Sequence, residues 1–140
     1  MKWHPLAQDI LATTGFDWAV KVWRLAGEGA ELVAELAGHT DQVYSLAWSG
    51  CGRFLATASR DGRVRVYEPR AGPSPVREGG QVVPRKGARL TWACEGRYLL
   101  LSGFSKQSER QVSWQVDISA FLLIMCESSK SCGTNPDQRW

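Results

Sequence analysis

The sequence predicts an all-β protein built from repeated units of short antiparallel strands, and three observations support this. Residues 48–67 reappear upstream in degenerate form as residues 3–23, and Leu11 aligns with Leu55 at an offset of 44 residues. A weaker third copy begins at Trp92. Within each copy, alternating apolar runs are separated by Gly-rich turns, which is typical of antiparallel hairpins. A period in the low forties with four strands per unit predicts blades of a β-propeller.

The middle unit has the clearest hairpin pattern. Its apolar runs predict three strands, at residues 43–48, 54–59 and 63–67. Glycines in the two connecting turns supply the positive φ that tight hairpins need. Of the two turns, the one that contains Asp61-Gly62 is the stronger indication of a hairpin. Because side chains alternate across a strand, both faces of such a sheet carry side chains that neighbouring units can cover.

The repeat divides the chain into five segments. They are an incomplete first blade without its innermost strand (1–37), a well-formed blade (38–68), a Pro/Gly/Arg-rich loop (69–87), a degenerate third blade (88–116) and a non-repeat tail whose composition is typical of disorder (117–140). Within the loop we expect at most a short outer strand, near Val76 or at residues 81–83. Residues 111–116 are a candidate for one further strand of the third unit.

Chain length limits how many blades can form. A closed propeller needs about four to eight blades, and 140 residues supply two to three units of this period. The sequence therefore predicts a partial propeller that does not close into a ring. Unpaired strand edges at the ends of such an array are templates for pairing with another chain, so self-association through open blade edges is one expectation.

The middle unit resembles a WD repeat. Gly38-His39-Thr40 stands where such units open, and Tyr67-Glu68 stands where they close with an aromatic and an acidic residue. In that family a His, an Asp, a Ser or Thr and a Trp form a buried hydrogen-bond network. The resemblance implies that its members here are His39, Asp61, Thr57 or Ser59, and Tyr67 in place of Trp. In the first unit it matches Asp17 and Trp23 to the same roles.

The amino-acid sequences of two segments resemble the coronin family, and most closely the long coronins with two propellers in one chain. These segments are LATTGFDWAVKVWRL and GHTDQVYSLAWSGCGRFLATASRDGRVRVYEPR, within a resemblance that covers about residues 1–110. The resemblance implies a scaffold that binds actin filaments, organises the cytoskeleton and takes part in Golgi-linked trafficking. It also implies a cytoplasmic location, on the cytoskeleton or at the Golgi.

The charge of the chain is locally basic. Lys and Arg total 17 against 14 Asp and Glu, and a net charge of +3 is too small to indicate nucleic-acid binding. Residues 53–97, however, hold nine Arg and one Lys against four acids. This band is either a solvated rim or a contact for an acidic partner such as an actin filament or an anionic membrane surface. Our candidates for that contact are Arg60, Arg63 and Arg65.

The sequence contains no recognisable catalytic or cofactor motif. Neither a phosphate-binding loop nor an HExxH or CxxC spacing occurs, and the four cysteines show no metal-ligand spacing. Of the two histidines, His4 stands in an expected turn and His39 belongs to the implied network. The longest apolar run, residues 120–126, has seven residues, whereas a spanning helix needs about 20. We therefore expect no catalytic site, no cofactor, no bound metal and no transmembrane segment.

Two hypotheses for function follow. The first is a non-enzymatic scaffold of coronin type that binds protein partners, with F-actin as the partner that the resemblance implies. The second is a truncated form without independent activity, which is unstable or acts by pairing with another propeller chain. An enzyme is the least favoured class, because the sequence brings no set of catalytic groups together.

Overall fold

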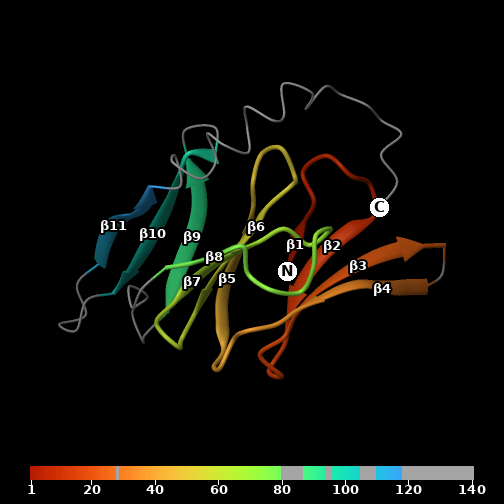
Figure 1. Ribbon diagram of the computed structural model, residues 1–140, viewed down its shortest axis with the longest axis horizontal. Coiled ribbons are helices and arrows are strands. Elements are labelled where there is room, and N and C mark those ends of the chain that lie inside the picture. The colour runs from red at the N-terminus through yellow and green to blue at the C-terminus, as the bar shows by residue number, and fades with distance from the viewer. Residues whose placement is uncertain (28, 80–86, 94–95, 105–109, 118–140) are drawn as a thin grey trace.

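The computed structural model describes residues 1–27, 29–79, 87–93, 96–104 and 110–117. In these ranges the chain forms three antiparallel sheets, which lie side by side in chain order (Figure 1). The sheets make an open row over the described residues and do not close into a ring. The predicted all-β class and the partial propeller are therefore confirmed.

The first sheet contains β1 (Lys2–Trp3), β2 (Ile10–Thr14), β3 (Val20–Ala26) and β4 (Gly29–Leu36) in that order. β1 pairs with β2, and this corrects the expectation that the first unit lacks its innermost strand. The strand has only two residues, which are too few for an alternating apolar pattern to reveal it. The first unit is therefore a four-stranded sheet with a shortened inner strand.

The middle sheet contains β5 (Val43–Trp48), β6 (Leu55–Ser59), β7 (Val64–Tyr67) and β8 (Arg77–Glu78). Its two hairpin turns contain Gly52 and Gly62, whose φ angles are 73° and 92°, in the left-handed region that glycine tolerates. β8 follows Val76, next to one of the two expected positions for an outer strand. The other position, residues 81–83, lies outside the described residues.

The third sheet contains β9 (Ala88–Ala93), β10 (Tyr98–Phe104) and β11 (Arg110–Asp117), with β10 in the centre. β11 includes the segment that the sequence marked as a candidate strand, and it pairs with β10. The predicted disordered tail, apart from Asp117, lies outside the described residues.

The middle sheet is buried on both faces. Every residue of β6 and β7 is buried. Leu55 and Tyr67 belong to an apolar cluster shared with the first sheet, whereas Ala56 and Val66 belong to a cluster shared with the third. Alternation along each strand thus places successive side chains in two different cores.

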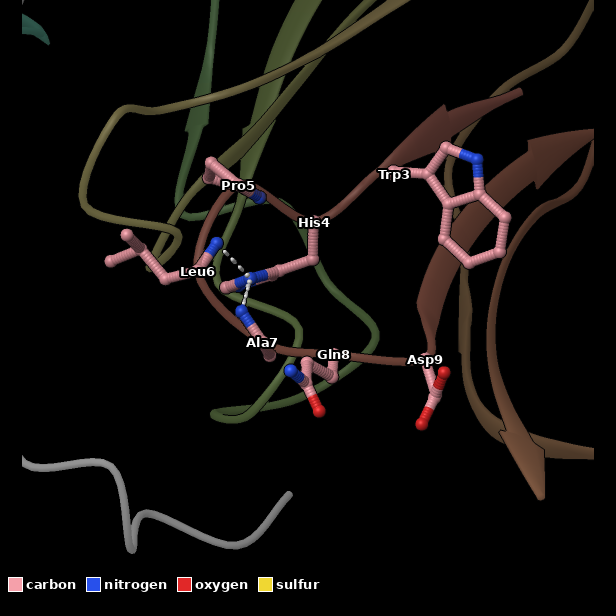
Figure 2. A pocket seen from close by; sticks show the side chains of 7 residues that line it. All are labelled: Trp3, His4, Pro5, Leu6, Ala7, Gln8 and Asp9. Atoms are coloured by element: carbon pink, nitrogen blue, oxygen red, sulfur yellow. Dashed lines mark hydrogen bonds between the residues drawn. The ribbon is translucent and has the colours of Figure 1, made fainter.

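His4 joins the turn before β2 to the middle sheet. Its Nδ1 accepts hydrogen bonds from the backbone N–H groups of Leu6, at 3.1 Å, and Ala7, at 2.7 Å (Figure 2). Its Nε2 lies 2.9 Å from the Gly52 carbonyl oxygen, and its ring meets Trp48 edge-on with centroids 4.8 Å apart. With both nitrogens engaged, His4 connects the two units.

Candidate interaction site

A buried polar network lies at the end of the middle sheet where the β6–β7 turn meets the segment before β5. His39 is at its centre. Its Nε2 lies 3.1 Å from Thr57 Oγ1 and 3.3 Å from the Tyr67 hydroxyl, and its Nδ1 lies 2.9 Å from Arg65 Nη1. Because a guanidinium can only donate, Nδ1 accepts and the proton of the neutral ring is on Nε2.

Arg65 connects this histidine to two carboxylates. From β7 its Nη1 also donates to Asp61 Oδ2 at 2.7 Å, and its Nε donates to Glu78 Oε2, on β8, at 3.0 Å. The residue is only 2% exposed. The planar guanidinium, with several donors in a fixed fork, can satisfy three acceptors in one plane. Arg65 therefore stands between Asp61 and His39 in the network.

Asp61 and Ser59 fix the loops around the network. Asp61 Oδ1 accepts from the Arg63 backbone N–H at 3.0 Å, and Oδ2 accepts from the Thr40 N–H at 3.3 Å. Ser59 Oγ lies 3.0 Å from the carbonyl oxygen of Asp41 and accepts from the Asp61 N–H at 3.3 Å. Of the two alternatives for the hydroxyl member, the structure thus places Thr57 beside His39 and Ser59 in the loop contacts.

The electrostatics hold each member in one protonation state near neutral pH. Burial, with the Arg65 charge, lowers the pKa of His39 to about 4. Burial raises the pKa of Asp61, but the hydrogen bonds from Arg65 and from two backbone N–H groups outweigh it, so the pKa is below its usual value. Burial raises the pKa of Tyr67 to about 12. A neutral His39 with both nitrogens engaged is suited to holding loops and not to transferring protons.

The first unit has equivalents of two contacts of this network, namely the aromatic–threonine hydrogen bond and the aspartate ion pair. Trp23 Nε1 donates to Thr13 Oγ1 at 2.8 Å, and these residues align with Tyr67 and Thr57. Asp17 forms an ion pair with Lys21 at 2.5 Å, as Asp61 does with Arg65. The first pair is exposed, however, whereas the second is buried. Asp17 and Trp23 therefore lie at positions equivalent to the middle network without being joined through a histidine.

Two of the three candidate contact arginines lie at the surface. Arg60 and Arg63 flank the β6–β7 turn, and their side chains are 55% and 49% exposed. Each lies near an acid, Arg60 at 3.9 Å from Asp41 and Arg63 against Glu78. Arg65 is not at the surface, and its proposed role in direct contact is corrected. Because side chains alternate along β7, the Arg65 side chain lies on the face of the middle sheet that the first sheet covers.

Sequence reasoning missed the structural role of Arg65 and of Glu78. A signal for the first was available, because Asp61 and Arg65 are four residues apart and the first unit has Asp17 and Lys21 at the same spacing. Glu78 gave no such signal, since it falls in the segment expected to be a loop. Its position follows from the pairing of β8 with β7.

The described residues offer little that could support chemistry. A hollow of about 370 Å³ lies at the turn that residues 3–9 form (Figure 2), and the titratable ring in it, His4, is engaged by backbone groups on both nitrogens. Within the described ranges no three His, Cys, Asp or Glu side chains gather as metal ligands would. Nor does the described part of the chain contain a helix with the length and apolar character needed to cross a membrane.

Comparison with known proteins places this geometry among WD repeats. The family model "WD domain, G-beta repeat" matches residues 30–68. Coronin-7 of Homo sapiens is 51% identical over 112 residues, which are 80% of this chain and 12% of that protein. The coronin-like protein of Saccharomyces cerevisiae is 34% identical over 110 residues, which are 79% of this chain and 16% of that protein. The chain thus spans a small part of the length of these relatives.

A solved structure agrees with the sequence matches. The crystal structure of the WD40 domain from Toxoplasma gondii coronin superposes with a TM-score of 0.71 at 26% sequence identity. The match covers 84% of this chain and 30% of that one. The arrangement of sheets described above is therefore similar to part of that WD40 domain.

The depressed pKa of His39 predicts a pH-dependent stability. The unfolded chain has an ordinary histidine pKa near 6.5, whereas the folded value is about 4. Between these values the unfolded state binds more protons, so the free energy of unfolding falls as the pH is lowered from about 6.5 to about 4. In urea titrations across this range, His39→Gln should show a shallower dependence than the wild type. Equal slopes for the two proteins would contradict the assignment.

Removing the guanidinium from the network should be far more destabilising than removing one from the surface. Arg65→Met leaves the Asp61 carboxylate, whose side chain is 6% exposed, without its charged partner, and we expect a loss of about 3 kcal/mol in unfolding free energy. The matched control, Arg63→Met, removes an exposed pair and should lose at most about 1 kcal/mol. Chemical denaturation followed by circular dichroism measures both. Similar losses for the two variants would show that Arg65 has no special role.

Proposed function

This chain is a WD-repeat protein related to the coronins, and from that premise we propose that it is a non-enzymatic scaffold that binds protein partners. Repeat folds of this kind present loops on a rigid base, and such loops are where binding residues concentrate. In this chain the β6–β7 turn is such a loop. The single observation that carries the proposal is that a largely buried network, centred on the buried Arg65, lies beneath this turn and holds two exposed arginines in place.

The partner that fits these arginines is an acidic surface, and we propose the actin filament. The β2–β3 and β6–β7 turns point to the same side of the molecule (Figure 1), so a partner on that side meets more than one unit. Arg60 and Arg63 pair with acids only in exposed positions. Exposed pairs contribute at most about 1 kcal/mol, so partner carboxylates can replace the internal ones.

The same resemblance carries proposals for location. We propose a cytoplasmic protein that associates with the cytoskeleton, and a contribution to Golgi-linked trafficking as in the long coronins. The sequence similarity to coronins supports both the cytoskeletal association and the role in trafficking. Both depend on this chain binding actin or another protein partner.

Co-sedimentation with filamentous actin tests the proposal. The folded wild-type chain should pellet with filaments at low salt and less at moderate salt, because screening weakens charge contacts. The double variant Arg60→Glu/Arg63→Glu should reduce the bound fraction several-fold. Arg24→Glu, on the first sheet, is a single charge-reversal control away from this turn and should bind as the wild type does.

Folded wild-type protein that stays in the supernatant in both buffers would exclude the actin role. Equal pelleting of the double variant and the control would exclude Arg60 and Arg63 as the contact and place it elsewhere on the chain.

A second candidate function is that the chain acts by pairing with another propeller chain. The specific observation in its favour is the exposure of large apolar side chains on the first sheet, where Trp3 is 57% and Leu32 is 45% exposed. Trp3 and Leu32 lie in one row across the paired strands of this sheet, through Leu11 and Trp23, and contiguous exposed apolar side chains are typical of interaction sites.

A further inference from the structure

The three sheets contain a tryptophan at the same register position of their first strand. Trp3 pairs with Leu11, Trp48 with Leu55 and Trp92 with Leu99. Successive leucines are 44 residues apart, which is the repeat period. The three tryptophans are therefore structural equivalents, although the sequence spacing between Trp3 and Trp48 is one residue longer.

Two of these tryptophans make the same contact with the preceding sheet. Trp48 Nε1 donates to the Lys2 carbonyl oxygen at 3.3 Å, and Trp92 Nε1 donates to the Ala47 carbonyl oxygen at 2.9 Å. Each acceptor is the residue directly before the tryptophan of the neighbouring sheet. One hydrogen bond thus recurs at both junctions between inner strands.

The apolar face beside each tryptophan also recurs. In the middle sheet Leu55, Thr57 and Tyr67 are 0% exposed, and Leu55 and Tyr67 pack against the first sheet. Their equivalents in the first sheet, listed in the same order, are Leu11, Thr13 and Trp23, which remain only half-buried. The face of the first sheet that corresponds to a sheet-to-sheet junction is therefore not covered by the described residues.

Trp3 lies at the inner end of this uncovered face. Its indole points away from His4 and from the turn that His4 holds (Figure 2). No hydrogen bond to its Nε1 occurs among the described residues, in contrast to its two equivalents. An indole N–H that is to be buried usually finds an acceptor, so the face is suited to a sheet that offers a backbone carbonyl at this point.

The chain itself contains the complementary face. Thr91 precedes Trp92, so its carbonyl is equivalent to the two acceptors above. On the far side of the third sheet, Tyr98 is 37% exposed and Leu100 is half-buried. Their equivalents in the middle sheet are Phe54 and Ala56, which are buried against the third sheet. The third sheet thus presents the surface that the first sheet lacks.

We propose that the first sheet of one copy of this chain packs on the third sheet of a second copy, with Trp3 Nε1 donating to the Thr91 carbonyl of that copy. The inference rests on the second candidate function and names its partner. The contact is head-to-tail, and such contacts form rings when the rotation closes. The described residues of two copies supply six sheets, within the range of about four to eight blades that close, so we expect a dimer and not a filament.

Sedimentation equilibrium of the purified chain tests the interface. The wild type should show a concentration-dependent dimer. Trp3→Arg, which adds a charge to the face, should raise the dimer Kd at least tenfold, and Trp3→Phe, which keeps the ring but loses the N–H, should raise it several-fold. Phe16→Arg is the matched control, since Phe16 is 91% exposed at the β2–β3 turn, and it should dimerise as the wild type does. Circular dichroism verifies that each variant is folded.

A mixing experiment tests the head-to-tail geometry. Trp3→Arg and Tyr98→Arg damage opposite faces, so each alone should be monomeric, whereas an equimolar mixture retains one intact interface and should dimerise. A monomeric mixture would overturn the geometry. A wild type that stays monomeric at its highest soluble concentration, or a Trp3→Arg variant that dimerises normally, would overturn the proposal and leave a blade of a different chain as the occupant. No actin is present, so failure here is separate from failure of the filament proposal.

Discussion

The middle sheet depends on having a neighbour on each face. Alternation sends successive side chains of β6 and β7 into two different cores, and every residue of both strands is buried. Burial of apolar area is the dominant favourable term in folding, so this sheet draws its stability from two junctions at once. The hydrogen bonds of Trp48 and Trp92, the His4 contact with Gly52 and the two apolar clusters are all features of those junctions.

The polar network fixes the loops at one end of the middle sheet. Arg65 lies between Asp61 and His39, so the hydrogen bonds that link the carboxylate to the histidine run through a guanidinium. Glu78 extends the same network to the outermost strand. A buried charge without a partner is strongly unfavourable, so the arrangement ties the β6–β7 turn, β7 and β8 into one unit. That rigidity supports the proposal that two arginines on the turn form a defined contact.

The sequence predicted the strands well wherever alternation and turn glycines coincide. β5 has the predicted bounds, and β6 and β7 begin one residue later than predicted. It did not predict β1, which has two residues. It gave the position of β8 only as one of two alternatives in a proline-rich segment, and it gave no role for Glu78. Alternation along β7 puts Arg65 on the same side of the strand as Tyr67. Whether that side faces water or another sheet depends on packing between units, which local patterns do not contain.

Amide hydrogen exchange is the most direct measure of whether the middle sheet is held from both faces. Exchange protection reports local opening free energy, and it should be greatest where both faces are covered. We expect the amides of β6 and β7 to exchange most slowly in the described chain, and those of the outer strand β4 to exchange much faster. Exchange of β6 and β7 as fast as that of β4 would contradict the account, because it would mean that the two junctions do not stabilise the sheet between them.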